Sequence, residues 1–247
     1  MESIEIQCKD GIMQTEMYAL MYCFRYFEKL FTVKMKKPEK PVLEFSCRTL
    51  SIALEYGFYD RLRDVKKSEN ITFSDIPEIY ACIDFLEFKQ SISDFITHMI
   101  LISAETSAET SMDKYDAEIT DIIIKCKISN IEKLLPKMSP ESIVKIFASG
   151  HVDIGYKVDK LHDEKIYQIY KLSNTSYLSM YSIKCISRMF TVEDFIYEFN
   201  DLANGLKDLN HDHFICFIKL LNGCKHLSRA PELKKHWKFL YAIDNGF

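Results

Sequence analysis

The chain has 247 residues, of which 47% are hydrophobic and 13% aromatic, and its formal net charge is −4. This composition excludes an intrinsically disordered chain. It also argues against a broad nucleic-acid surface, which needs clustered and uncompensated Lys and Arg. The short basic run at 34–40 contains proline and is interpreted as a solvated loop.

Cysteine usage and hydropathy predict a compartment. The eight cysteines fall singly along the chain, mostly within apolar patterns, where Cys behaves as a small hydrophobic residue. The first residues lack the basic start and apolar run of a signal peptide. No apolar stretch approaches the roughly 18 residues that span a bilayer. We therefore expect a reduced, soluble protein of the cytoplasm or nucleus that does not enter a membrane.

The first sixteen residues carry the pattern of a β-hairpin. Apolar residues at 4, 6 and 8 alternate with Glu5 and Gln7, as in a half-buried strand. Asp10-Gly11 follows, and glycine tolerates the positive φ of a tight hairpin turn. We expect strands over 4–8 and 12–16.

Helical and extended patterns then alternate. Apolar residues recur every three or four positions over 18–31, which predicts a helix with one buried face. Residues 41–45 predict a short strand, and Ser46 is placed to cap a helix that runs to Leu62. Ser74 is the expected cap of the next helix, which carries proline in its first turn.

The stretch "SDIPEIYACIDFLEFKQSISDF", residues 74–95, predicts two helices with a short break between them. An apolar helical pattern ends near Phe88, pauses over Lys89-Gln90 and restarts at once. Helices joined by so short a connection pack as a hairpin.

A polar repeat divides the chain. The segment "SAETSAETS" at 103–111 is a tandem duplication of small and polar residues without an apolar face. Such a segment has little surface to bury, so we predict a flexible linker over 104–116. It separates an N-terminal domain, 1–103, from a C-terminal domain, 117–247.

The C-terminal domain is predicted to be all-α. Helical spacing of apolar residues recurs throughout, and no strand alternation of similar quality appears. The expected helices cover 119–135, 140–149, 161–172, 177–190, 192–206, 211–221 and 231–243.

The order of the N-terminal elements resembles the BTB/POZ family. The closest likeness is to its short form in the Skp-type adaptor of SCF ligases and in elongin C. The segments that carry the resemblance are "SIEIQCKDGIMQTE", "FEKLF", "PVLEF", "SCRTLSIALEYGFYDRL" and "ACIDFLEFKQSI". The resemblance covers residues 1–103 and implies an α+β domain, a small sheet capped by helices. The second half resembles the BACK-type helical extension of cullin adaptors through "SPESIVKIFASGHVDI".

Two departures from the family pattern limit what the resemblance implies. Dimerising members carry an extra helix and strand before the first strand, whereas this chain begins at that strand, which argues against a homodimer formed by strand exchange. Many cullin-binding members carry an apolar-x-Glu motif after the third helix. Residues 63–75 lack it, although Skp-type adaptors bind cullin without it.

The resemblance also implies a partner-binding edge around the helix ending at Leu62, the loop after it and residues 78–88. The candidate partner-binding residues are Tyr56, Tyr59, Arg61, Phe73, Glu78 and Phe88. Tyr56 and Tyr59 lie off the apolar face of their helix, and tyrosines beside an arginine are typical of interfaces. Ordinary partial burial of tyrosine explains them equally well.

One cluster contains residue types that bind zinc: His211, His213, Cys216, Cys224 and His226. Zinc requires about four nitrogen or sulfur ligands in a tetrahedron, usually from closely spaced pairs. Cys216 lies within "FICFI", where burial accounts for it. Polar residues at a helix start and two core cysteines are the preferred interpretation, and no metal is expected.

The sequence predicts no enzyme. It contains no G-x-S-x-G elbow, Walker loop or G-x-G-x-x-G motif. By resemblance we expect a non-enzymatic adaptor, without a cofactor, that recruits a cullin-type ubiquitin-ligase scaffold and a target protein. The alternatives are a BTB-like interaction or decoy protein that binds no cullin, and a zinc-binding protein. Residue usage rich in Ile, Lys, Tyr and Phe suits an AT-rich genome, such as that of a virus or a protist.

Overall fold

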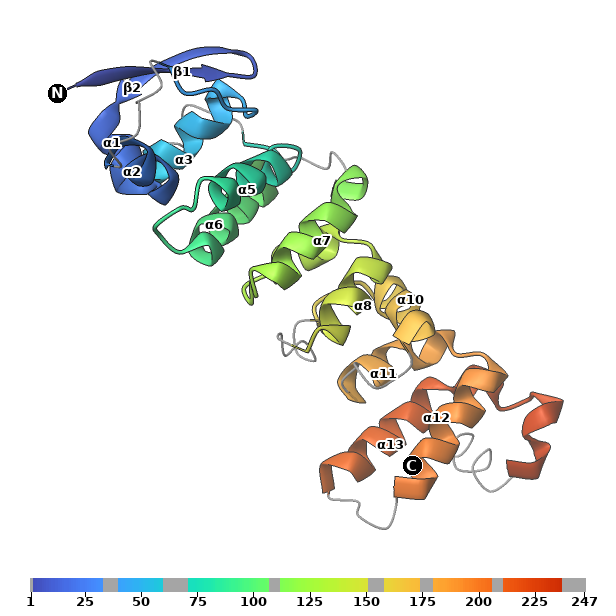
Figure 1. Cartoon of the computed structure of the whole chain (residues 1–247). Coiled ribbons are helices and arrows are strands. Elements are labelled where there is room, and N and C mark those ends of the chain that lie inside the picture. The colour runs from blue at the N-terminus through green and yellow to red at the C-terminus, as the bar shows by residue number, and fades with distance from the viewer. Residues whose placement is uncertain are drawn as a thin grey trace. The chain divides into compact units, whose positions relative to one another are not determined.

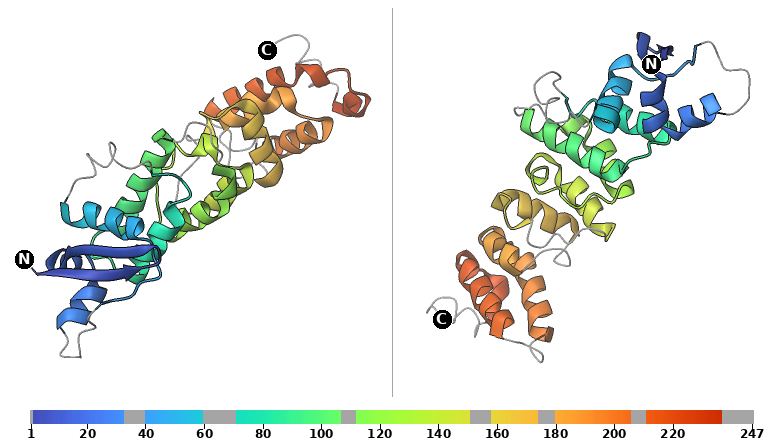
Figure 2. Two further views of the ribbon diagram at one scale, coloured as in Figure 1. Left: turned by 90° about the horizontal axis from the view of Figure 1, so that it is seen from above. Right: turned by 90° about the vertical axis from the view of Figure 1, so that its left-hand side faces the viewer.

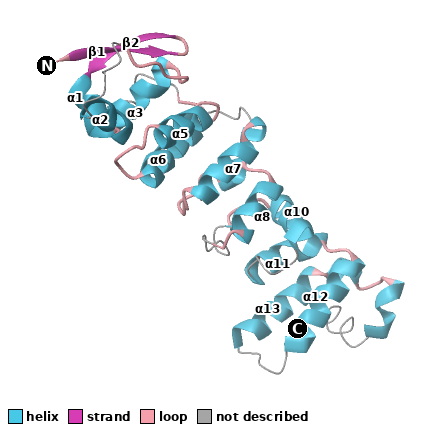
Figure 3. Cartoon of the chain, in the orientation of Figure 1, coloured by secondary structure: helices cyan, strands magenta, loops and turns pink. Residues whose placement is uncertain are grey.

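The computed structural model describes residues 2–32, 40–59, 71–106, 112–150, 158–173, 180–205 and 211–236. These residues are mostly helical and contain a two-stranded antiparallel sheet (Figures 1 and 3). The chain forms two compact units, Met1–Ser139 and Pro140–Phe247. None of the described helices combines the length and apolarity needed to cross a bilayer.

The predicted β-hairpin is confirmed. Strand β1 (Ser3–Cys8) pairs antiparallel with β2 (Gly11–Glu16), and Cys8 lies opposite Gly11 at the turn. The hairpin lies against helices of the first unit, where β2 contacts α1 (Met17–Cys23) and α3 (Cys47–Tyr59) (Figure 2).

The predicted strand at 41–45 is reduced to a single parallel bridge between Gln7 and Val42. The backbone N–H of Gln7 donates to the carbonyl oxygen of Pro41 at 2.8 Å, and that of Leu43 donates to the carbonyl oxygen of Gln7 at 2.8 Å. Proline has no N–H to donate to a ladder, which limits how far the pairing extends.

The first unit contains further helices, two of them short 3₁₀ helices. They are α2 (Arg25–Thr32), α5 (Ile76–Phe85), α6 (Ile92–Thr106), α7 (Asp116–Lys125), η1 (Met112–Lys114) and η2 (Leu135–Lys137). The predicted helix over 119–135 is therefore shorter and begins earlier than expected.

The single helix predicted over 18–31 is wrong, because it breaks at Phe24. Phe24 is fully buried and extended, with φ −130° and ψ 130°, and it pairs with Phe88 in an antiparallel bridge. On either side of this bridge, Lys89 N–H donates to the Cys23 carbonyl at 2.8 Å and Arg25 N–H donates to the Glu87 carbonyl at 3.0 Å. These long-range hydrogen bonds replace helical ones, so the break is invisible to local periodicity.

The helical hairpin predicted over 74–95 is confirmed. Helix α5 ends at Phe85, Glu87 adopts a positive φ of 55°, and α6 begins at Ile92. The predicted cap at Ser74 is wrong. Asp75 occupies the N-cap position, and its carboxylate accepts a hydrogen bond from the Thr72 N–H at 2.8 Å. The cap predicted at Ser46 is confirmed, since its hydroxyl accepts from the Thr49 N–H at 3.1 Å.

Gly57 of α3 lies against the side chains of Cys23 and Phe88. A Cβ there would lie 2.8 Å from the Cys23 Sγ and 2.9 Å from the Phe88 ring. We expect Gly57→Ala to lower the free energy of unfolding by about 1 kcal/mol. Overpacking costs roughly 1–3 kcal/mol, and the gain in helix propensity of about 1 kcal/mol offsets part of it. Urea unfolding measures the difference, and a stabilised variant would contradict the tight contact.

The predicted linker over 104–116 is partly helical. Residues 104–106 belong to α6, Asp116 begins α7, and 107–111 lie outside the described residues. Ile119 and Ile123 of α7 are fully buried, and α7 packs on α5. The first compact unit therefore extends to Ser139, and the division between units does not coincide with the predicted domain limits.

Within its described residues, the second unit is helical, as predicted. Its elements are α8 (Pro140–Ala148), α10 (Asp163–Ser173), α11 (Met180–Ile186), η4 (Ser187–Met189), α12 (Val192–Gly205), α13 (His211–Gly223), η6 (Lys225–Leu227) and η7 (Pro231–His236). Helix α10 packs on α8 and α11, and α11 packs on α13. Gly150, with φ +72°, follows the end of α8 and matches the predicted stop.

Candidate interaction surface

Three aromatic side chains gather on the first unit. Tyr18 and Tyr22 of α1 are 62% and 52% exposed, and they lie beside the half-buried Phe58 of α3. The Phe58 ring centroid lies 5.9 Å from that of Tyr18 and 5.7 Å from that of Tyr22, both in edge-to-face geometry. Tyr18, Tyr22 and Phe58 are called the Tyr18 surface below.

Helix geometry explains how the Tyr18 surface forms. Ala19, Leu20 and Cys23 form the buried side of α1. Tyr18 and Tyr22 are four residues apart, so they stack one above the other on a different face of the same helix. Because α1 packs on α3, Phe58 near the end of α3 completes the group.

A second aromatic group surrounds Phe85 at the end of α5. The Phe85 side chain is 58% exposed, and its ring centroid lies 5.7 Å from that of Tyr26 and 5.7 Å from that of Phe45. Tyr26, Phe45 and Phe85 are called the Phe85 surface. Grouped exposed apolar side chains, in contrast to lone surface residues, are typical of interaction sites.

Three of the six partner-binding residues predicted from the sequence, Tyr56, Phe73 and Phe88, pack in the core. Phe73 and Phe88 are only 3% and 7% exposed. The Tyr56 ring centroid lies 4.3 Å from that of Phe95 and 6.3 Å from that of Phe88. These three rings therefore fill the space between α3 and the α5–α6 hairpin and leave little area for a partner. The Tyr59 side chain and Arg61 lie outside what the structure describes.

Glu78, another predicted partner-binding residue, has a structural role. Its carboxylate accepts a hydrogen bond from the backbone N–H of Ser46 at 2.9 Å. This N–H lies at the start of α3, so Glu78 on α5 ties the two helices together. A lysine at position 78 would disturb the fold, which makes Glu78 unsuitable for testing partner binding.

The described members of the His/Cys cluster make contacts other than with one another. The Cys224 Sγ donates to the Ser187 carbonyl oxygen at 3.4 Å, and the His226 Nε2 lies 3.0 Å from the Phe190 carbonyl oxygen. The side chains of His211, His213 and Cys216 lie outside the described part. Among the described side chains, no three of His, Cys, Asp or Glu are grouped as metal ligands.

A polar network in the second unit centres on Asp194. Its carboxylate accepts hydrogen bonds from the Tyr167 hydroxyl at 3.1 Å, the Tyr170 hydroxyl at 3.3 Å and the Lys171 Nζ at 2.6 Å. Burial opposes ionisation of Asp194, but hydrogen bonds from Lys171 and Thr191 outweigh it and lower the pKa of the carboxyl. A hollow of about 330 Å³ borders this network.

The Asp194 network is suited to structure rather than to proton transfer. Burial, followed by the nearby Asp194 charge, raises the pKa of both Tyr167 and Tyr170. A tyrosine acts as a general base near neutral pH only if its pKa is lowered. The network therefore joins α10 to the start of α12.

The buried cysteines have unreactive thiols. Burial raises the pKa of Cys23, Cys82 and Cys224 to about 12 in each case. Because the thiolate is the nucleophile, these side chains remain inert at neutral pH. They act as small core residues, as their apolar sequence context predicts.

Comparison with protein-family models, curated proteins and solved structures gives no significant match for this chain. The Tyr18 surface is therefore defined by its geometry alone. The sequence contains a signal for it, since Tyr18 and Tyr22 fall off the apolar face of the first helix. The periodicity of the first helix could not predict that Phe58 joins this surface, because Phe58 belongs to another helix more than thirty residues away.

Proposed function

We propose that this protein is a non-enzymatic protein-interaction adaptor whose N-terminal unit holds a partner on the Tyr18 surface. The observation that carries the proposal is the grouping of three aromatic rings, two of them more than half exposed. Tyrosine is enriched among the residues that dominate binding energy at protein interfaces. Two aromatic rings on one helix face also lose little conformational entropy on binding, because each has only two rotatable side-chain bonds.

We further propose that the N-terminal unit is a Skp-like BTB domain that docks a cullin-type scaffold, while the helical unit, BACK-like, holds a target. The order of the β-hairpin, α3 and the α5–α6 hairpin supports this reading. The reduced third strand and the break at Phe24 differ from the elements that the sequence predicted for this domain. The alternative is a BTB-like interaction or decoy protein whose partner is not a cullin.

A double variant tests the surface. We expect Tyr18→Ala with Tyr22→Ala to weaken partner binding at least tenfold, because truncating an interface anchor costs about 2 kcal/mol or more. Binding of the full chain to a panel of purified cullin N-terminal domains is measured by calorimetry. Circular dichroism and the melting temperature verify that the variant is folded.

Two controls separate the outcomes. Tyr197→Ala, on the second unit, removes a tyrosine that is also 52% exposed and should leave binding unchanged. Phe85→Ala reports whether the Phe85 surface is used as well. If the wild-type chain binds no cullin, the cullin assignment is wrong. Affinity purification with wild-type and double-variant bait then tests the adaptor proposal, and identical partners for both baits would exclude the Tyr18 surface.

A further inference from the structure

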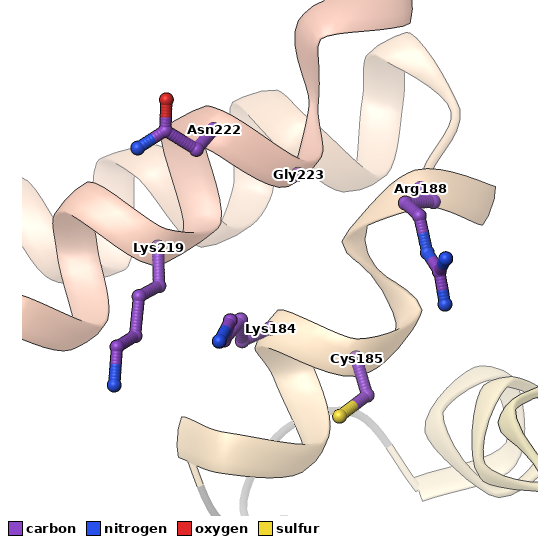
Figure 4. A pocket seen from close by; sticks show the side chains of 6 residues that line it. All are labelled: Lys184, Cys185, Arg188, Lys219, Asn222 and Gly223. Atoms are coloured by element: carbon purple, nitrogen blue, oxygen red, sulfur yellow. The ribbon is translucent and has the colours of Figure 1, made fainter. Parts of the chain in front are cut away.

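The second unit contains a hollow of about 480 Å³ whose charged lining residues are all basic (Figure 4). Its lining consists of Lys184, Cys185 and Arg188 from α11 and η4, and of Lys219, Asn222 and Gly223 from α13. Figure 4 shows the Lys184 side chain extending toward the side of Lys219, with Arg188 at the other end of the hollow. This concentration of positive charge contrasts with the net charge of −4 of the whole chain.

The two lysine ammonium groups of the hollow are available to contact a ligand. Among the described residues, neither Lys184 nor Lys219 forms an ion pair. Arg188 pairs with Asp163, with Nη2 and Oδ2 2.6 Å apart, but its side chain is 71% exposed. An exposed pair of this kind contributes little, and a guanidinium has five N–H donors, so Arg188 retains donors for a ligand.

The backbone beneath the hollow is held in place. A Cβ on Gly223 would overlap the Ser187 Oγ and lie 2.7 Å from the Ser187 Cβ, so only glycine allows α13 to approach η4 this closely. The Ser187 Oγ donates to the Lys184 carbonyl oxygen at 2.7 Å, and the Cys224 Sγ donates to the Ser187 carbonyl oxygen at 3.4 Å. The helices that carry Lys184 and Lys219 are therefore fixed before any ligand arrives.

We propose that this hollow binds a phosphoryl group, carried by a phosphorylated peptide or by a small organic phosphate. A phosphoryl group carries up to two negative charges and three acceptor oxygens, which match two ammonium groups and a guanidinium better than a single carboxylate does. Arginine can bind a phosphate with two parallel hydrogen bonds, and lysine contributes a compact point charge. This site is separate from the Tyr18 surface, so either proposal can fail without the other.

Binding is tested on the full chain with inorganic phosphate, O-phosphoserine, a mixture of peptides with one fixed phosphoserine, and the same peptides without phosphate. Cys185 provides a local reporter, because its thiol lines the hollow and no disulfide involves it. We expect the phosphorylated probes to slow alkylation of Cys185, followed by peptide mass spectrometry, at least threefold. The unphosphorylated peptides should not slow it, and rising salt should weaken the protection.

Variants link the protection to the lysines. We expect Lys184→Gln with Lys219→Gln to weaken phosphoryl binding, measured by calorimetry, at least tenfold. Lys127→Gln with Lys225→Gln removes the same charge from two exposed lysines outside the hollow and should leave binding unchanged. Circular dichroism verifies the fold of both variants.

The probes also identify the source of the phosphoryl group. Tighter binding of phosphopeptides than of O-phosphoserine assigns the site to a phosphorylated protein segment, and equal binding assigns it to a small phosphate. The proposal is overturned if sodium chloride at equal ionic strength protects Cys185 as well as phosphate does. It is also overturned if no probe protects Cys185, or if the hollow variant binds phosphoryl groups as tightly as the control variant.

Discussion

Replacing Asp194 with alanine is expected to lower the free energy of unfolding of the second unit by about 3 kcal/mol. Thr191 and Asp194 form a capping box at the start of α12: the Asp194 carboxylate accepts from the Thr191 N–H at 2.8 Å, and the Asp194 N–H donates to the Thr191 hydroxyl at 3.2 Å. Loss of a cap costs about 1 kcal/mol. The buried Tyr170 hydroxyl would also lose its acceptor, which costs about 1–3 kcal/mol.

Asp194→Asn is the matched control for this prediction. Asparagine keeps one acceptor oxygen for the cap and for a tyrosine but loses the charge that pairs with Lys171. We expect it to cost roughly half as much as alanine, about 1–2 kcal/mol. Urea unfolding of the full chain, with hydrogen exchange over 163–205 to locate the effect, measures both. Equal losses in the two variants would mean that charge, and not the acceptor geometry, governs the network.

The pH dependence of the Asp194 contribution follows from its lowered pKa. Because the folded carboxyl releases its proton more readily than the unfolded one, its stabilising effect is present above the unfolded pKa, about 4. The effect is lost as the pH falls below that value through the folded pKa.

The second large effect is expected at Glu198 and has the opposite pH dependence. Glu198 of α12 is 1% exposed, and its Oε1 has no hydrogen-bond partner among the described residues. Burial, followed by repulsion from Asp201 and Asp194, raises its pKa from 4.5 to about 7. The folded state therefore holds a proton that the unfolded state has released between these values, and stability falls as the pH rises from about 4.5 to 7.

Glu198→Gln removes the ionisable carboxyl and therefore the loss of stability that its ionisation causes in the folded state. We expect the variant to be more stable than the wild type by on the order of 2 kcal/mol at pH 8, after allowance for solvent screening, and nearly equal to it at pH 5. Urea unfolding at the two pH values makes the comparison. A stabilisation of the same size at pH 5 and pH 8 would show that packing, and not ionisation, is responsible.

The Asp194 network shows what local sequence patterns can predict and what they cannot. The sequence "TVED" at 191–194 predicts the start of a helix, and that start is confirmed. The same letters give no reason to expect that Asp194 also accepts hydrogen bonds from Tyr167 and Tyr170 on another helix. The tyrosines and the acid are brought together by helix packing, which sequence spacing does not encode.

The same distinction between local sequence patterns and long-range packing applies to the candidate surfaces. Tyr18 and Tyr22 lie off the apolar face of α1 and are exposed, whereas Phe73 and Phe88 are buried. Tyr56 also lies off an apolar face, yet the α5–α6 hairpin covers it through Phe95. A helical face is solvent-exposed only if no other element packs against it, and that depends on the whole fold.

Local sequence patterns were sufficient to predict the hairpin of β1 and β2, the helical hairpin of α5 and α6, and the helical character of the second unit. Each depends on alternation, helical spacing, or a turn or capping residue within a few positions, and these interactions act over short stretches of chain. Three features could be seen only in the folded chain: the break at Phe24, the reduction of the third strand to one bridge, and the position of Lys184 and Lys219 beside one hollow. Those features arise from contacts between residues far apart in the chain, whose free energy outweighs the local preference for helix or strand.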